Sequence, residues 1–189
     1  MEIKLTSRFE DALLYAARLH ARQVRKVSGN PYIAHLLSVA ALVIEDGGSE
    51  DEVIAALLHD AVEDQGGDVT RQEIRIRFGE RVAAIVDGCT DADSFPKPPW
   101  RERKEKFISS LSFASSEVLR VTAADKLDNV RSILISYDDL REGVWEHFKG
   151  KKDGTLWYYQ AIAQVLCSKM GGALTRSLEK AVAELKLLQ

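Results

Sequence analysis

Polar side chains with metal-ligating chemistry interrupt an apolar segment of the chain. Residues 53–64, VIAALLHDAVED, begin with six apolar residues and then carry His59, Asp60, Glu63 and Asp64. A run that is apolar on every side predicts a helix in the core. Spacings of three and four place the acids along adjoining edges of one side of that helix. Carboxylates crowded in a core repel one another, and a divalent cation resolves that conflict.

Two further segments carry residues of the same kind. His35 lies in the first turn of a mostly apolar run, and Asp125 lies in the middle of another, with Asn129 one turn later on the same face. An acid in a core helix needs a partner, because an unpaired buried carboxylate is very costly. Two imidazoles and two carboxylates suit Mn, Fe or Zn better than Ca or Mg. The predicted ligands are His35, His59, Asp60 and Asp125.

The elements that position these residues are predicted to be helices. Apolar residues recur at intervals of three and four almost throughout, and no run alternates as a strand does. Ser49 with Glu52, and Thr70 with Glu73, have the spacing of a capping box. The predicted helices span about 8–23, 33–44, 49–64, 70–79, 80–89, 100–113, 116–135, 155–169 and 174–188, with loops at 91–100 and 145–152. We expect an all-α fold, a single-domain helical bundle over residues 1–189.

Composition limits the partners. The formal net charge is −3, from 26 basic and 29 acidic residues, which argues against a duplex nucleic-acid binder. The basic residues gather at 22–26, 97–106 and 149–152, which suits a small phosphorylated ligand, although solvated loops explain any one group equally well. No apolar run approaches the ~18–20 residues of a membrane span, and the start of the chain lacks a secretory signal. We expect a cytoplasmic protein that binds neither nucleic acid nor membrane.

The order of His35, His59-Asp60 and Asp125 resembles the HD phosphohydrolase superfamily. More narrowly, four motifs resemble the (p)ppGpp hydrolase domain of the Rel/Spo alarmone enzymes: RKVSGNPYIAH, ALLHDAVED, FGERVAAIVDGCTD and AADKLDNVRSI. They occur in order across roughly residues 8–170. The chain ends where large family members continue into synthetase and regulatory domains, so it looks like a small stand-alone alarmone hydrolase. The resemblance implies a fold of HD-domain type.

The resemblance also implies roles for individual residues. His35, His59, Asp60 and Asp125 align with the metal ligands, and the family metal is Mn²⁺, while Fe²⁺ and Zn²⁺ also fit the donor set. Glu63 and Asp64 align with the acidic pair that activates the attacking water. The residues that align with substrate contacts are Arg25 beside the base, Lys26 near phosphate, Asn129 in the base pocket, and Lys97 and Tyr158 near other ligand positions.

Three further positions bear on the site. Asp128 stands where the family usually has His or Tyr. His20 and His147 are the only other histidines, and we expect both on the surface or at the pocket rim, which leaves ligands for a single ion per chain. Arg25 and Lys26 also admit a simpler reading, in which they complement the dipole at the end of the first helix.

Three functions remain open. The first is hydrolysis of the 3′-pyrophosphate of a guanosine alarmone, giving GDP and pyrophosphate from ppGpp. The second is an HD phosphatase acting on another nucleotide, such as the 2′-phosphate of NADPH or a nucleoside 5′-monophosphate. The third is a module that senses a nucleotide without cleaving it. The physiological nucleotide, the native metal, the oligomeric state and the role of residues 145–159 do not follow from the sequence.

Overall fold

Helices make up most of this computed structural model, which describes residues 4–92 and 96–188, and no strand occurs within those ranges. The helices are α1 (Ser7–Leu19), α2 (Ile33–Glu45), α3 (Glu50–Leu58), α4 (Ala61–Gln65), α5 (Asp68–Phe78), α6 (Glu80–Cys89), α7 (Trp100–Ser110), α8 (Ser116–Leu140), α9 (Lys151–Lys169) and α10 (Ala173–Lys186). Short 3₁₀ helices span Leu111–Phe113 and Arg141–His147. The expected all-α fold is confirmed.

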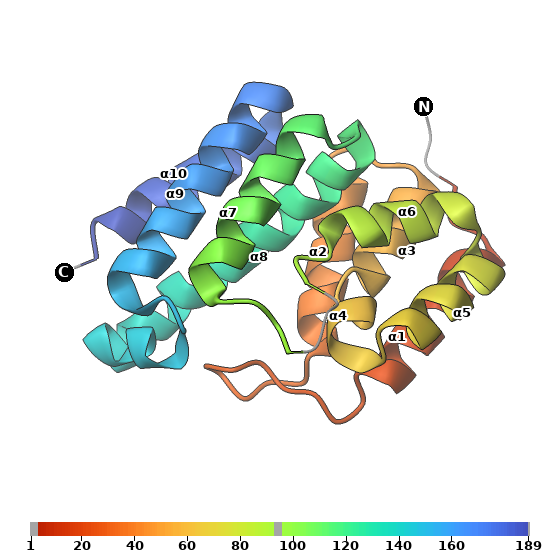
Figure 1. Cartoon of the computed structure of the whole chain (residues 1–189), viewed down its shortest axis with the longest axis horizontal. Coiled ribbons are helices and arrows are strands. Elements are labelled where there is room, and N and C mark those ends of the chain that lie inside the picture. The colour runs from red at the N-terminus through yellow and green to blue at the C-terminus, as the bar shows by residue number, and fades with distance from the viewer. Residues whose placement is uncertain (1–3, 93–95, 189) are drawn as a thin grey trace.

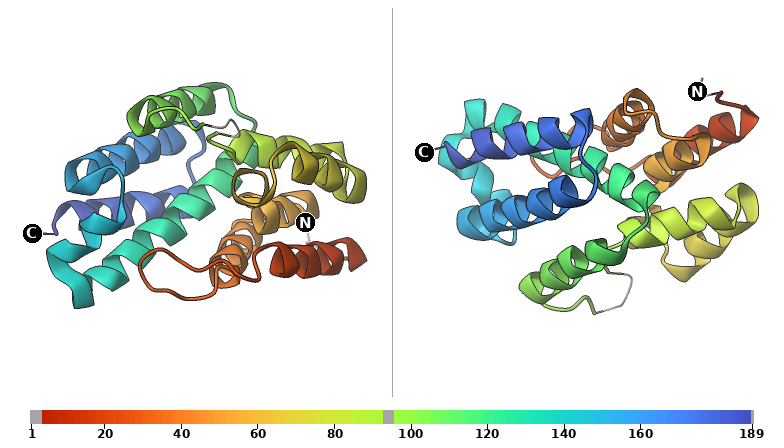
Figure 2. Two further views of the ribbon diagram at one scale, coloured as in Figure 1. Left: turned by 60° about the horizontal axis from the view of Figure 1, so that its bottom comes forward. Right: turned by 90° about the horizontal axis from the view of Figure 1, so that it is seen from above.

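Helix α8 joins the two halves of the molecule. Its 25 residues give it a length of about 37 Å. Helices α2, α3 and α6 pack against it, and so do α9 and α10. Figures 1 and 2 show α1 to α6 on one side of the molecule and α7, α9 and α10 on the other, with α8 passing between them. Residues in the middle of α8 therefore face both halves.

Helix α3 is the core helix that its sequence predicts. Every side chain from Val53 to Leu58 is fully buried, because α3 packs against α1, α2, α6 and α8. The predicted capping box is present: the Ser49 backbone N–H donates to Oε2 of Glu52 at 2.6 Å. Glu52 also accepts a hydrogen bond from Arg120 on α8. This contact ties the start of α3 to α8.

The prediction of one continuous helix over 49–64 is wrong, because the helix is broken at His59 and Asp60. Helix α3 ends at Leu58 and α4 begins at Ala61. Nδ1 of His59 lies 2.8 Å from the carbonyl oxygen of Ala56, so the imidazole occupies an acceptor that the next helical turn would otherwise use. Asp60 follows with φ −97° and ψ −2°, away from helical values. The break turns both residues toward α2 and α8.

Several predicted boundaries also need correction. Helix α1 ends at Leu19, not near residue 23, and α8 continues five residues beyond Ile135. The signal at Thr70 is not a cap, since α5 begins at Asp68 and the Thr70 hydroxyl donates to the carbonyl oxygen of Gln65. The expected loop at 145–152 is partly 3₁₀ helix. Of the expected loop at 91–100, residues 93–95 lie outside the described ranges.

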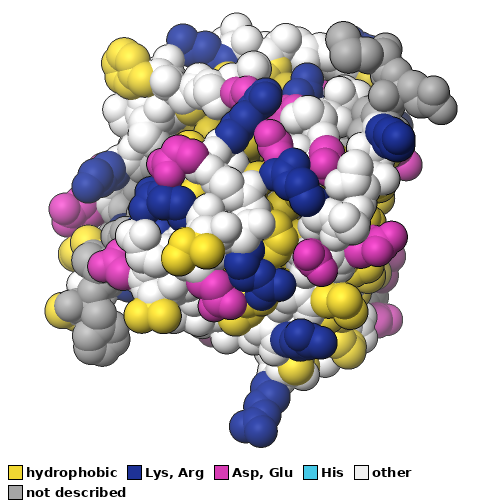
Figure 3. Space-filling view, turned by 90° about the vertical axis from the view of Figure 1, so that its right-hand side faces the viewer, with side chains coloured by type: hydrophobic (Ala, Val, Ile, Leu, Met, Phe, Trp, Pro, Cys, Tyr) yellow, Lys and Arg dark blue, Asp and Glu magenta, His cyan; other side chains and the backbone are white. Residues whose placement is uncertain are grey.

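Charges of both signs are interspersed on the face formed by the right-hand side of Figure 1. Figure 3 shows basic and acidic side chains alternating there, without a continuous basic surface on that face. Ion pairs account for part of the pattern: Arg8 on α1 reaches Glu50 and Asp51 on α3 at 3.3 and 2.8 Å. Among the described residues, no helix has both the length and the apolar character that a membrane span requires.

Gly88 on α6 provides a test of how closely α6 and α8 pack. A Cβ atom there would lie 2.5 Å from Cγ2 and 2.9 Å from Cγ1 of Val118. Because valine is stiff about χ1, Gly88→Ala should lower the free energy of unfolding by about 1–3 kcal/mol, measured by urea denaturation. Gly143→Ala is the matched control, since a Cβ there meets no atom within 4 Å. Equal stability of the two variants would contradict the packing described.

Candidate active site

The predicted ligands converge from three parts of the fold. His35 from α2, His59 from the end of α3 and Asp125 from the middle of α8 each offer one ligand atom, and these atoms lie within 4.8 Å of one another. Oδ1 of Asp125 is 3.3 Å from Nε2 of His35 and 3.6 Å from Nε2 of His59. Oδ2 of Asp60 lies 3.0 Å from Nε2 of His59 and 3.7 Å from Nε2 of His35. All four side chains therefore border one small space.

Both imidazoles are held through their other ring nitrogen. Nδ1 of His35 is 2.6 Å from Oδ2 of Asp128, and Nδ1 of His59 is 2.8 Å from the carbonyl oxygen of Ala56. A carboxylate and a carbonyl only accept, so each Nδ1 must donate. In the neutral rings this fixes both tautomers and leaves the lone pair on each Nε2 available to a metal ion. Hydrogen bonds of this kind orient histidines that bind metals.

The two Nε2 atoms are the observation that indicates a metal. Both are buried, and neither has a hydrogen-bond partner among the described residues, although carboxylate oxygens lie nearby. Buried polar atoms are rarely left without a partner. Two free imidazole lone pairs beside two carboxylates fit a divalent cation, and a neutral or apolar occupant would leave them unsatisfied. The residues present therefore fit a divalent metal site.

The electrostatics of the site also favour positive charge at its centre. Burial favours the neutral form of His59, yet the carboxylates of Asp60 and Asp125 together raise its pKa well above the usual range. Burial also opposes ionisation of Asp125, but the Lys126 ammonium and the two imidazoles hold its pKa well below the usual range. Asp125 is further bonded to Lys126 and Asn129. The carboxylates are thus kept charged in a buried setting.

Glu63 and Asp64 lie one turn beyond the His59–Asp60 break, on α4, and both line the same pocket. Oε1 of Glu63 accepts a hydrogen bond from Nζ of Lys97 at 2.8 Å and lies 3.7 Å from the guanidinium of Arg103. Oδ2 of Asp64 accepts a hydrogen bond from the amide of Gln23 at 2.8 Å. Each acid is held by a different segment of the chain.

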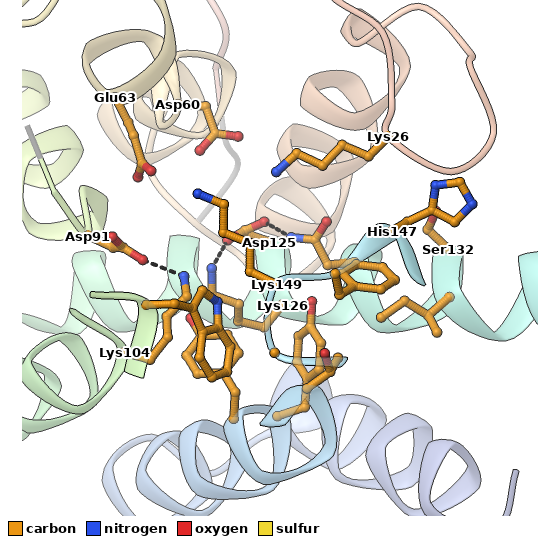
Figure 4. Close-up of a pocket in the computed structure, with 18 of the residues that line it drawn as sticks. Lys26, Asp60, Glu63, Asp91, Lys104, Asp125, Lys126, Ser132, His147 and Lys149 are labelled. Carbon is orange, nitrogen blue, oxygen red and sulfur yellow. Dashed lines mark hydrogen bonds and ion pairs between the residues drawn. The ribbon is translucent and has the colours of Figure 1, made fainter. Parts of the chain in front are cut away.

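A cavity of about 450 Å³ opens beside the cluster, a size that suits a nucleotide-sized ligand. Seven basic side chains line it: Arg25, Lys26, Lys97, Arg103, Lys104, Lys126 and Lys149. Among the described residues, five acidic side chains line it: Asp60, Glu63, Asp64, Asp91 and Asp125. Figure 4 shows Asp60 and Glu63 on one side of the cavity, Lys104 and Lys126 on the opposite side, and the Lys26 ammonium pointing inward.

All five predicted substrate contacts line this cavity. Arg25 donates to Oδ1 of Asn129 at 3.0 Å and lies 3.6 Å from Oδ2 of Asp128, so it sits against the α8 face that carries Asp125. Lys97 bonds to Glu63, and Tyr158 is buried in the wall formed by α9. The helix-dipole reading of Arg25 and Lys26 is wrong, because α1 ends six residues before Arg25 and the dipole acts only within the last turn.

The two remaining histidines differ. His147 is exposed and lines the cavity, as expected for the pocket rim. His20 is only 3% exposed, so the expectation that it lies at the surface or rim is wrong. It stacks on Tyr32 with ring centroids 5.3 Å apart, and its Nδ1 lies 2.7 Å from Oε1 of Gln23. His20 continues the buried face of α1: it follows Ala12 and Ala16 at spacings of four, and its backbone N–H donates to the Ala16 carbonyl oxygen at 3.0 Å.

Helices α7 and α9 close the far wall of the cavity through a tight contact. A Cβ atom at Gly150 would lie 2.7 Å from Cη2 of Trp100, and one at Gly154 would lie 3.3 Å from the same atom. The indole of Trp100 also packs edge-on against Trp157 and Tyr158. The segment 145–159 thus holds α7 in place and supplies Phe148, Lys149 and Tyr158 to the cavity.

Sequence reasoning missed several residues of the site. Asp128 was visible as a departure from the family pattern, and its place three residues after Asp125 on a core helix is the signal that could have identified its role. Asp91, whose side chain is buried, pairs with Arg103 and Lys104, but no periodicity indicates this. The contact of Tyr32 with Oδ2 of Asp60, at 2.5 Å, was equally invisible.

Comparisons with known proteins identify the family. A family model described as an HD domain matches residues 12–152. The chain belongs to the HD-domain family. It is 34% identical over 178 residues to the human guanosine-3′,5′-bis(diphosphate) 3′-pyrophosphohydrolase MESH1, a match that covers 93% of this chain and 90% of that protein. It is 37% identical over 133 residues to the enzyme of that name from Aquifex aeolicus.

The share of each relative that is covered differs. The match to the Aquifex enzyme covers 69% of this HD-domain chain but only 18% of that longer protein. Among solved structures, a metazoan orthologue of SpoT described as hydrolysing ppGpp matches with a TM-score of 0.81, 25% identity and full coverage of both chains. A protein from Listeria monocytogenes matches with a TM-score of 0.70 and 31% identity over 80% of this chain and 97% of that one.

Asp128 should control metal affinity without being a ligand. Asp128→Asn removes the negative charge that holds Nδ1–H of His35, so the affinity for Mn²⁺ should fall about 10- to 100-fold, measured by calorimetric titration. Asp139→Asn, an exposed acid near the end of the same helix, is the control and should leave the affinity unchanged. An Asp128→Asn protein with native affinity would show that His35 needs no such support.

Proposed function

We propose that this HD-domain protein is a Mn²⁺-dependent hydrolase that removes the 3′-pyrophosphate of ppGpp, giving GDP and pyrophosphate. The observation that carries the proposal is the pair of buried Nε2 atoms of His35 and His59, which have no hydrogen-bond partner among the described residues and lie beside Asp60 and Asp125. Asp60 and Asp125 in turn line a cavity that also carries seven described basic side chains. The names of the human and Aquifex relatives supply the substrate class. We also propose that residues 1–189 form one hydrolase domain and bind one ion.

His35, His59, Asp60 and Asp125 would hold the metal. A divalent ion there supplies Lewis acidity, which lowers the pKa of a water molecule and offsets negative charge on a phosphoryl oxygen. Mn²⁺ and Fe²⁺ suit a mixed set of imidazoles and carboxylates, as does Zn²⁺. The hydrogen bonds that Nδ1 of each imidazole donates keep the two histidine rings oriented before a metal binds, which reduces the ordering that binding requires.

Glu63 and Asp64 act on the attacking water in this proposal. They project from α4, directly after the break that positions His59 and Asp60. A carboxylate within hydrogen-bond reach orients a water and takes its proton as the new bond to phosphorus forms. The bond between the 3′ oxygen and phosphorus then breaks, the proton taken from water passes to the 3′ oxygen, and GDP and pyrophosphate leave. Two adjacent acids allow one to accept the proton while the other holds the water.

Other residues that line the cavity bind the nucleotide in this proposal. Arg25 lies with Asn129 on one side of the cavity, where a planar guanidinium can stack on a purine. Lys26 and Lys149 line the cavity with no ion pair recorded among the described residues, so both are available to phosphate oxygens. Lys97 and Tyr158 complete the wall opposite. A ligand with two diphosphate groups matches this concentration of positive charge.

An assay of purified protein against several nucleotides tests the proposal. With Mn²⁺ present, ppGpp should be converted to GDP and pyrophosphate in equal amounts, identified by chromatography, and a chelator should abolish the reaction until Mn²⁺ is restored. The metal content should be one ion per chain. Faster cleavage of NADPH at its 2′-phosphate, or of a 5′-monophosphate, would overturn the alarmone assignment. Tight binding without turnover of any nucleotide would indicate a sensor.

Glu63→Gln should separate chemistry from binding. The amide keeps the size of the side chain but accepts no proton, so kcat should fall by about 10²–10⁴, while Mn²⁺ content and KM for ppGpp stay near those of the native protein. Glu73→Gln, on the exposed face of α5, is the control. Loss of the metal together with activity would mean that Glu63 is a ligand instead.

Arg25→Ala should weaken substrate binding selectively. Removing the guanidinium should raise KM for ppGpp strongly and leave Mn²⁺ content unchanged, because Asp128 still accepts from His35. Arg18→Ala, an exposed arginine in the last turn of α1, is the control for loss of a positive charge. An unchanged KM in Arg25→Ala would remove Arg25 from the substrate site.

A further inference from the structure

Gln23 occupies an unusual place beside the proposed active site. It follows α1, in the segment that leads to Arg25 and Lys26, and its side chain lies between this segment and α4. Nε2 of Gln23 donates to Oδ2 of Asp64 at 2.8 Å. Among the described residues, this amide makes the only hydrogen bond recorded for the Asp64 carboxylate. Gln23 itself does not line the cavity.

The orientation of the Gln23 amide is fixed by two further donors. Oε1 of Gln23 lies 2.7 Å from Nδ1 of His20 and 2.5 Å from Nε2 of Gln65. Gln65 can only donate through Nε2, so the atom it meets must be the amide oxygen. A flipped amide would set two NH₂ groups against each other and place its oxygen against the carboxylate of Asp64. The NH₂ group is therefore directed to Asp64.

His20 completes this arrangement from the core. Since Oε1 of Gln23 accepts, Nδ1 of the neutral His20 ring must carry the proton, and Nε2 is left buried without a partner. Burial lowers the pKa of His20, which favours this neutral form. The ring is also packed against Tyr32. His20 therefore acts as a rigid, buried support for the amide.

The backbone links the same residue to the other side of the site. The Gln23 carbonyl accepts a hydrogen bond from the Tyr32 backbone N–H at 2.9 Å, and Val24 pairs with Pro31 in an antiparallel bridge. The Tyr32 hydroxyl donates to Oδ2 of Asp60 at 2.5 Å. The two ends of the segment 23–32 thus contact Asp64 through a side-chain amide and Asp60 through a phenol.

We infer that Gln23 is a positioning residue, which holds the Asp64 carboxylate by one oxygen so that the other is presented to the attacking water. The inference rests on the proposed function, since it assigns a role in that reaction. Gln23 touches neither substrate nor metal. Its effect passes through Asp64. The hydrogen bond also fixes the position of the Asp64 carboxylate relative to the segment that carries Arg25 and Lys26.

Two substitutions test this role. Gln23→Glu keeps an oxygen for His20 and Gln65 but sets a carboxylate against Asp64. Gln23→Met removes the amide without adding charge. Both should lower kcat for ppGpp about 10- to 100-fold, the scale of a misplaced reacting group, with KM and Mn²⁺ content unchanged. Gln164→Leu, an exposed glutamine on α9, is the control and should show native kinetics.

A double-mutant cycle separates positioning from general support of the fold. In an Asp64→Asn background, Gln23→Met should cause no further loss of kcat, because the carboxylate on which Gln23 acts is gone. Full additivity of the two losses would overturn the inference. So would a fall in Mn²⁺ content or a rise in KM that accounts for the lost activity of Gln23→Met.

A crystal structure of Gln23→Met with Mn²⁺ gives a readout that is independent of substrate. The Asp64 carboxylate should leave its native rotamer while His35, His59 and Asp125 stay in place. An unmoved Asp64 would overturn the inference whatever the kinetics. If the native protein cleaves another nucleotide, the cycle is measured with that nucleotide. If it cleaves none, the proposed function fails, and the position of Asp64 still decides the role of Gln23.

Discussion

The site depends on two hydrogen bonds that are not directed at any ligand. Nδ1 of His35 donates to Asp128, and Nδ1 of His59 donates to the carbonyl of Ala56. These bonds turn both Nε2 atoms toward Asp125, where no other side chain of the described residues makes a hydrogen bond with them. The second bond also ends α3, since the imidazole takes the acceptor that helical continuation would use. The same contact therefore orients a ligand and creates the bend that brings α4 and its two acids to the cavity.

Helix α8 shows how the rest of the fold serves this arrangement. Its buried residues pack against both halves of the molecule, so Asp125 meets histidines from α2 and α3 on one side while Lys126 points to the aromatic wall of α7 and α9 on the other. Asp125 thus faces the histidines, while its neighbour Lys126 faces the aromatic side chains of α7 and α9. Because Asp125 and Lys126 are consecutive residues of one helix, their relative position is fixed by α8.

The sequence was sufficient for features that depend on local pattern. Apolar spacing gave the helical class, and His35, His59 and Asp125 stood out because polar residues in core helices are rare. Contacts between distant segments were not predictable in this way. The break at His59 coincides with one side-chain hydrogen bond inside a run of good helix formers. The burial of His20, by contrast, follows the spacing of Ala12 and Ala16 on α1. The partners of Glu63 and Asp64 come from residues 23, 97 and 103, whose convergence only the tertiary fold determines.

The basic side chains of the cavity are in large part already neutralised. Lys97 is bonded to Glu63, Arg103 and Lys104 to Asp91, and Lys126 to Asp125. A phosphorylated ligand that binds these cations must compete with carboxylates of the protein itself, and the exchange gains little unless the ligand offers more charge than it displaces. Because the carboxylates compete for these cations, one phosphate group gains little binding free energy there. Several phosphate groups on one ligand gain more, since together they carry more negative charge than the carboxylates they displace. The cavity can therefore discriminate among nucleotides by the number of phosphates they carry, in addition to any contact with the base.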